Sequence, residues 1–235
     1  MASPHHTRRA RRLGFASLVL AATLVATGCA GLTDAIDSVT GGDEPAPVST
    51  PTPSGSAAME FDSVFSFDGS VTVTSTIADE LDIVLDIWAV DPRRTQEWTA
   101  SNEKVFGFSV NANDLLVSDR AVLKDKRRVY LSQIAITSQT SQTSGQTAQP
   151  FQYMADPRTL VPADTLRSSR GLLINSFQGG LLVPETAIQQ LPEDTVGLTL
   201  TFALTVSVEG TADDSSSFAQ QTVYQTVPIA IYPPE

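Results

Sequence analysis

The residues with the clearest capacity for chemistry are carboxylates. Five acids gather within thirteen positions and an acidic pair follows in a serine-rich turn: Asp79, Glu80, Asp82, Asp86, Asp91, Asp213 and Asp214. Carboxylate oxygens are hard ligands that suit calcium, and two carboxylates at the right separation can hydrolyse glycosides. Neither group shows the alternate ligands and glycine turn of a calcium loop. We therefore interpret these acids as a solvated strand face and expect no metal site.

The two tryptophans, Trp88 and Trp98, are a second kind of candidate. Exposed indole rings can form a platform on which sugar rings stack, whereas burial in the core is the commoner use of aromatic side chains. We expect the core role, and the sugar platform is the alternative.

The basic residues are few but clustered. From residue 59 onward the chain has 11 basic and 22 acidic residues, yet five basic ones fall within nine positions, at Arg120, Lys124, Lys126, Arg127 and Arg128. Such a patch can dock on anionic lipid headgroups, an anionic wall polymer or an acidic face of a partner protein. The alternative is an ordinary solvated turn, partly neutralised by Asp119 and Asp125.

Cys29 is the one cysteine of the 235 residues, and it closes an apolar run. Four arginines precede the run, at Arg8, Arg9, Arg11 and Arg12, and the run itself occupies residues 13–26. Fourteen apolar residues are fewer than the roughly 20 that span a bilayer. The pattern predicts an export signal rather than a lasting transmembrane helix.

The residues Val25, Ala26, Thr27, Gly28 and Cys29 resemble the signal of bacterial lipoproteins. In that family a small residue precedes a cysteine whose thiol receives a diacylglyceryl group, and cleavage then leaves this cysteine first in the chain. The resemblance covers residues 1–29 and has Ala26 where leucine is commoner. It implies that Cys29 is lipidated and that the chain is held at the extracytoplasmic face of the cell membrane. An ordinary secretory signal with a free thiol is the alternative.

Removal of residues 1–28 would change the available chemistry. Four arginines and both histidines, His5 and His6, would leave, so that 11 basic residues face 26 acidic ones. Because the remaining chain would have no imidazole and no free thiol, it could form neither a Ser-His-Asp or Cys-His catalytic site nor a zinc site built on His or Cys. We expect no catalytic residues, no cofactor and no nucleic-acid partner.

The composition after Cys29 divides the rest of the chain in two. Residues 30–58 are mostly Gly, Ser, Thr, Pro, Asp and Ala, too poor in large apolar side chains to form a core, and predict a disordered tether with a mean reach of about 30 Å. The predicted parts are thus a signal peptide at residues 1–28, the lipidated Cys29 with its tether at residues 29–58, and a folded domain at residues 59–235.

The folded part has apolar residues at every second position. The clearest case predicts a strand with one buried face, formed by Leu198, Leu200, Phe202, Leu204, Val206 and Val208. The same pattern predicts strands at residues 61–67, 71–77, 81–90, 105–110, 128–137, 171–177 and 222–231. About eight or nine strands without a long helix predict an all-β, antiparallel β-sandwich.

Local signals refine this fold. An odd loop ending at Gly69 would pair Phe65 with Val71 and place Gly69 in the left-handed conformation. Proline at a first helical position predicts one short helical turn within residues 184–191.

The stretch that follows, Leu191-Pro192-Glu193-Asp194-Thr195, resembles the corner before strand F of immunoglobulin domains. Leu198 and Leu200 replace the tyrosine and cysteine of that family. The resemblance implies an immunoglobulin-like sandwich rather than a true immunoglobulin domain.

Together these patterns predict a membrane-anchored, extracytoplasmic lipoprotein that acts as a non-catalytic binding or interaction module of the cell envelope. Its partners would be the membrane, through the lipid, and an envelope protein or anionic polymer. The alternatives are a carboxylate-dependent envelope enzyme of the glycoside hydrolase type and a passive structural spacer.

Overall fold

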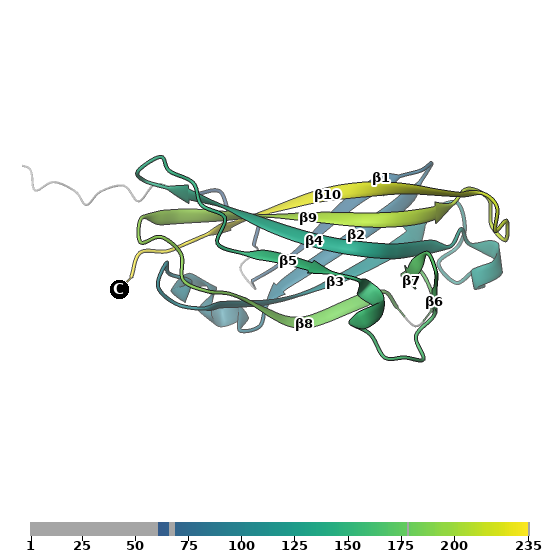
Figure 1. The fold of residues 1–235 in the computed structure, drawn as a ribbon, viewed down its shortest axis with the longest axis horizontal. Coiled ribbons are helices and arrows are strands. Elements are labelled where there is room, and N and C mark those ends of the chain that lie inside the picture. Colours follow the sequence, from purple (N-terminus) through teal and green to yellow (C-terminus); the bar gives the residue numbers. More distant parts are fainter. Residues whose placement is uncertain (1–60, 66–68, 178, 235) are drawn as a thin grey trace, which may run out of the picture. The chain divides into compact units, whose positions relative to one another are not determined.

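The computed structural model describes residues 61–65, 69–177 and 179–234 of the chain. The predictions made for residues 1–58, Cys29 included, lie outside these residues. The described part contains ten strands and three short 3-10 helices, η1 to η3 (Figure 1). In chain order they are β1 (Ser70–Ile77), β2 (Leu81–Ala89), η1 (Pro92–Glu97), β3 (Lys104–Asp114), η2 (Leu123–Asp125), β4 (Val129–Gln142), β5 (Gln152–Ala155), η3 (Pro157–Thr159), β6 (Arg167–Ser168), β7 (Gly171–Leu173), β8 (Leu181–Ile188), β9 (Thr195–Glu209) and β10 (Phe218–Ala230).

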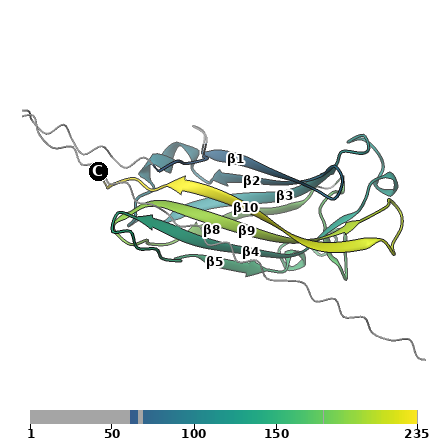
Figure 2. The same cartoon turned by 90° about the horizontal axis from the view of Figure 1, so that it is seen from above.

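The strands form two antiparallel sheets. The four-stranded sheet has the order β1-β2-β3-β8, and the six-stranded sheet has the order β10-β9-β4-β7-β6, with β5 paired to β4. Figure 2 shows the two layers, with β1, β2 and β3 in one and β9, β4 and β5 in the other. The predicted all-β antiparallel sandwich is confirmed.

Alternating hydrophobicity explains why the layers stack. On β2, Leu81, Ile83, Leu85 and Ile87 are at most 1% exposed, and on β9 the six predicted core residues are at most 4% exposed. Because successive strand side chains point to opposite faces, each strand offers one apolar face to the other sheet. Phe108 of β3 and Phe202 of β9 meet across the core edge to face, with ring centroids 5.4 Å apart. The buried face of β9 is thus confirmed.

The opposite face of β9 differs from the prediction at one end. Thr199, Thr201 and Thr205 are partly exposed as expected, but Ser207 and Glu209 are buried. Glu209 is covered because Arg128 pairs with it, an arrangement between residues 81 positions apart that periodicity cannot signal.

The first predicted strand, at residues 61–67, is not formed in its described part. Residues 61–65 have no strand conformation, and Val64 N–H donates to the carbonyl oxygen of Pro228 at 3.0 Å. The ring of Phe65 packs on Trp98 and does not pair with Val71, whose partner is Ile87. The expectation for Gly69 holds, because its φ is +67°.

The predicted helical turn after Pro184 is wrong, because these residues belong to β8. Along β3, Phe106 is opposite Thr186 and Phe108 is opposite Val183, so two residues of β8 oppose Gly107 alone. Proline is tolerated at such a bulge on an edge strand, where its missing N–H breaks no ladder. The stretch at residues 191–195 leads into β9, which begins at Thr195.

Candidate functional site

The predicted basic patch is divided by the structure. Arg127 is 6% exposed, and its guanidinium forms an ion pair with Asp114 at 2.6 Å. The same guanidinium donates to the carbonyl oxygens of Ala78 at 2.6 Å and Asp79 at 2.9 Å. Arg127 therefore holds the loop between β1 and β2 against the start of β4 and does not contribute to an exposed patch.

That loop needs such support. Ala78, Asp79 and Glu80 have φ values of 42°, 49° and 63°, the left-handed region that non-glycine residues avoid. Residues in this region cost on the order of 1–3 kcal/mol each and persist where their surroundings hold them. The Arg127 guanidinium holds this loop with its two hydrogen bonds to the carbonyl oxygens of Ala78 and Asp79. Leu115 N–H donates a third hydrogen bond to the loop, to the carbonyl oxygen of Glu80 at 2.9 Å.

Arg128 is also engaged. It pairs with the fully buried Glu209, and its guanidinium lies 5.6 Å from the centroid of the Phe218 ring. The hydrogen bond to Glu209 raises the pKa of Arg128. Burial alone would raise the pKa of Glu209, but the hydrogen bonds from the Arg128 side chain and backbone hold it below its usual value. This ion pair joins the residue before β4 to the last residue of β9, at one end of the six-stranded sheet.

The other three cations lie in the loop that joins β3 to β4. Lys124 is exposed, and Lys126 donates to the carbonyl oxygen of Asp119 at 2.7 Å. Within the described residues the guanidinium of Arg120 has no hydrogen-bond or ion-pair partner. Arg120 and Lys126 both line one pocket, whereas Lys124 does not.

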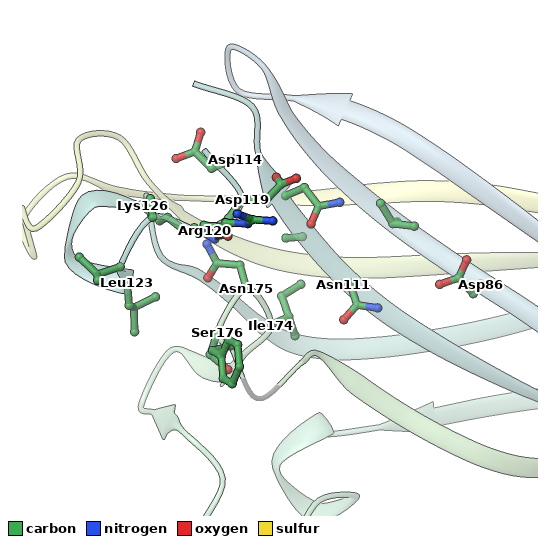
Figure 3. Close-up of a pocket in the computed structure, with 16 residues that line it drawn as sticks. Asp86, Asn111, Asp114, Asp119, Arg120, Leu123, Lys126, Ile174, Asn175 and Ser176 are labelled. Carbon is green, nitrogen blue, oxygen red and sulfur yellow. Dashed lines mark hydrogen bonds between the residues drawn. The ribbon is translucent and has the colours of Figure 1, made fainter. Parts of the chain in front are cut away.

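The pocket has a volume of about 800 Å³ and lies where three parts of the sandwich meet. One wall is the loop of residues 119–126, a second is the outer face of β2 and β3, and the third is the segment of residues 174–177 after β7. Figure 3 shows Lys126 and Arg120 toward one end, Asp86 at the other, and Asn111 between them. Its volume lies within the 300–1,000 Å³ or so of small-molecule sites.

Asp86 organises the sheet end of the pocket. One of its carboxylate oxygens accepts from the Thr72 hydroxyl at 2.6 Å, and the other accepts from the Ser109 hydroxyl at 3.2 Å. These three residues are register partners on β1, β2 and β3, so the hydrogen bonds run straight across the outer face of the sheet. The arrangement fixes the Asp86 carboxylate beside Asn111, which lines the same wall.

Asn175 fixes the third wall. Its side-chain oxygen accepts from Val129 N–H at 3.1 Å, and its amide nitrogen donates to the carbonyl oxygen of Arg127 at 2.6 Å. Both partners lie at the start of β4, so this buried amide attaches the segment to the six-stranded sheet. Phe177, two residues later, is fully exposed at the pocket.

The acidic residues singled out from the sequence do not gather. In the described part of the chain, no group of three or more Asp, Glu, His or Cys residues is placed to hold a metal ion. Asp86 joins the pocket, and Asp82 accepts from Thr76 at 2.6 Å on the same sheet face. Asp214 accepts hydrogen bonds from Ser216 in its own turn, which lowers its pKa.

The tryptophans also separate. Trp98 is 7% exposed and stacks edge to face on Phe65 at 5.7 Å, as core packing predicts. Trp88 is partly buried on the outer face of the four-stranded sheet. A methyl group at Gly107 would lie 2.6 Å from two ring atoms of Trp88, so the indole covers this glycine. Trp88 lies two residues after Asp86 on β2, and because strand side chains alternate between faces, the two side chains are on the same face of the sheet.

Several pocket residues had no signal in the sequence. Asn111, Asn113 and Asn175 are single amides among many polar residues, and Phe177 falls at the end of a predicted strand. The alternation of β3 does place Asn111 and Asn113 on its outer face, beside Asp86, but only the strand register shows which residues of β2 they adjoin.

Neither a protein-family model nor a curated protein matches this chain. Among the described residues, no helix is long and apolar enough to cross a membrane.

Proposed function

We propose that this protein is a lipid-anchored binding module of the cell envelope, tethered through Cys29 at the extracytoplasmic face of the cell membrane. The observation that carries this proposal is the pocket of about 800 Å³ at one end of the sandwich. Its walls combine apolar, amide and charged side chains, the mixture that positions and orients a ligand.

The rigidity of the pocket walls supports binding as the role. Asn175, Arg127 and Asp114 are all buried and hydrogen-bonded, and together they fix the segments that form two of the three walls. A preformed site loses less conformational entropy when a ligand binds. The described residues contain neither histidine nor cysteine, which favours binding over nucleophilic catalysis.

The experiment compares retention of envelope material by wild-type protein and by a variant with a blocked pocket. Full-length protein is immobilised in detergent, and solubilised envelope from the source cells is passed over it, with retained protein and polysaccharide both measured. Asn113→Trp places an indole at an exposed pocket residue on β3 and should reduce retention about tenfold.

Thr226→Trp is the matched control, because it adds the same side chain at an exposed strand position on the six-stranded sheet, away from the pocket. It should retain as much material as the wild type. Equal retention by all three proteins would exclude the pocket as the binding site, and a lack of retention by the wild type would exclude the binding function.

A further inference from the structure

The charges of the pocket are separated along its length. Arg120 and Lys126 lie toward one end, and the fixed carboxylate of Asp86 lies at the other (Figure 3). The Asp114 carboxylate is already neutralised by Arg127. Of the two acids in the loop of residues 119–126, Asp119 lines the pocket and Asp125 does not. This loop therefore places two cations and one anion at this end of the pocket, on a domain with 11 basic and 22 acidic residues.

We propose that this pocket binds a carboxylated saccharide, with its carboxylate at Arg120 and Lys126 and its hydroxyl groups at the sheet end. The inference rests on the proposed function and names the ligand class for the same site. A guanidinium binds a carboxylate through two parallel hydrogen bonds, and the guanidinium of Arg120 has no partner in the part of the chain that the structure describes.

The rest of the pocket suits sugar hydroxyl groups. The side-chain amides of Asn111 and Asn113 each offer two donors and an acceptor, and Asp86 has acceptor sites beyond the two that Thr72 and Ser109 use. Hydroxyl groups are both donors and acceptors, so they match this mixture of groups better than a purely anionic ligand does.

One aromatic ring, that of Phe177, lines the pocket together with this polar wall. Phe177 is fully exposed at the pocket. Trp88 lies on the same face of β2 as Asp86 but does not line the pocket itself. The flat face of an aromatic ring can cover the apolar C–H face of a sugar ring. A volume of about 800 Å³ is also far more than a single ion requires.

A lipid headgroup fits these observations less well. Docking on a membrane needs cations that project together from the surface, and two of the five clustered basic residues, Arg127 and Arg128, are engaged in ion pairs. The cations that remain in the pocket share it with amides and an aromatic ring.

The test uses two ligands with the same sugar backbone, of which one carries charged carboxylates and the other carries neutral methyl esters. Hexagalacturonate carries one carboxylate on each ring, and its fully methyl-esterified form is the neutral counterpart. Titrated calorimetrically into the full-length protein in detergent, the acid should bind at least about tenfold more tightly than the ester. Raising the ionic strength should reduce this preference.

Three variants assign the roles. The double variant Arg120→Gln with Lys126→Gln should abolish the preference for the acid, because both pocket cations are lost. Lys124→Gln is the control, since Lys124 is exposed in the same loop but does not line the pocket, and it should keep the wild-type preference. Phe177→Ala should weaken both ligands about fivefold and leave their ratio unchanged.

Several results would overturn the proposal: no binding of either hexasaccharide at millimolar concentration, equal binding of acid and ester, or an equal loss with Lys124→Gln. Tighter binding of glycerol 3-phosphate, a soluble headgroup analogue, would assign the cations to phosphate chemistry. If the sugars fail while Asn113→Trp still reduces retention of envelope material, the binding function stands and only the ligand class is wrong.

Discussion

Lys104 is a buried residue whose protonation should make the stability of the fold depend on pH. It is 1% exposed, and its ammonium donates to the carbonyl oxygens of Ala100 and Gln189, each at 3.4 Å, and of Asn102. These contacts join the loop before β3 to the end of β8. Burial lowers the pKa of Lys104 from 10.5 to about 8.

The sign of the pH dependence follows from this shift. Between pH 8 and 10 the unfolded chain keeps the proton on Lys104 that the folded protein has released, so stability should rise with pH, by at most about 1.4 kcal/mol per pH unit. Burial raises the pKa of Tyr153, which opposes this trend above pH 10. Urea unfolding at pH 7.5, 8.5 and 9.5 measures the effect.

Lys104→Met is the control variant for this titration. It removes the ammonium and keeps an unbranched side chain, so the rise between pH 8 and 9.5 should disappear even if the variant is less stable throughout. The same slope in the variant and the wild type would show that another group is responsible.

At the residue scale, the sequence shows where the basic side chains cluster but not which of them form ion pairs in the fold. Arg127 and Arg128 are adjacent to Lys126 in a cluster of cations, yet their partners, Asp114 and Glu209, lie 13 and 81 positions away. Each pairing depends on where strands begin and end in space. The basic patch could therefore be located from the sequence, while its reduction to two pocket cations required the fold.

At the scale of elements, β9 makes the most specific stability prediction. Leu204 is fully buried and is the register partner of Val223, whereas Thr205 is partly exposed and its hydroxyl lies 3.3 Å from that of Thr222. Leu204→Asp should lower the free energy of unfolding by more than about 3 kcal/mol, because an unpaired carboxylate enters the core.

Thr205→Asp introduces the same group one residue later and should cost less than about 1 kcal/mol, because its carboxylate can reach water and the Thr222 hydroxyl. Thermal unfolding of the two variants beside the wild type makes the comparison. Similar losses in both would contradict the assignment of the two strand faces.

Two of the predicted strands have an uninterrupted period of two in their sequence. The strands β2 and β9 keep this period over nine and fifteen residues, and the prediction located both. The strands β5 and β6 have four and two residues, too few for any period to show. In β8, Pro184 interrupts the pattern and resembles a helix start, and only its place on an edge strand reveals that the chain stays extended.

At the scale of the whole molecule, the proposed anchor and the pocket would act together, since a tether with a mean reach of about 30 Å would hold the pocket near the membrane while leaving it free to turn. Cys29→Ala removes the one thiol that could carry the lipid. The variant should lose incorporation of labelled fatty acid and move from the detergent phase to the aqueous phase on Triton X-114 partition, with its thermal unfolding unchanged. Ser38→Ala, nine residues further along, should keep both the label and the detergent partition. Labelled fatty acid on the Cys29→Ala protein would contradict the lipidation of Cys29 and place the anchor elsewhere in the chain.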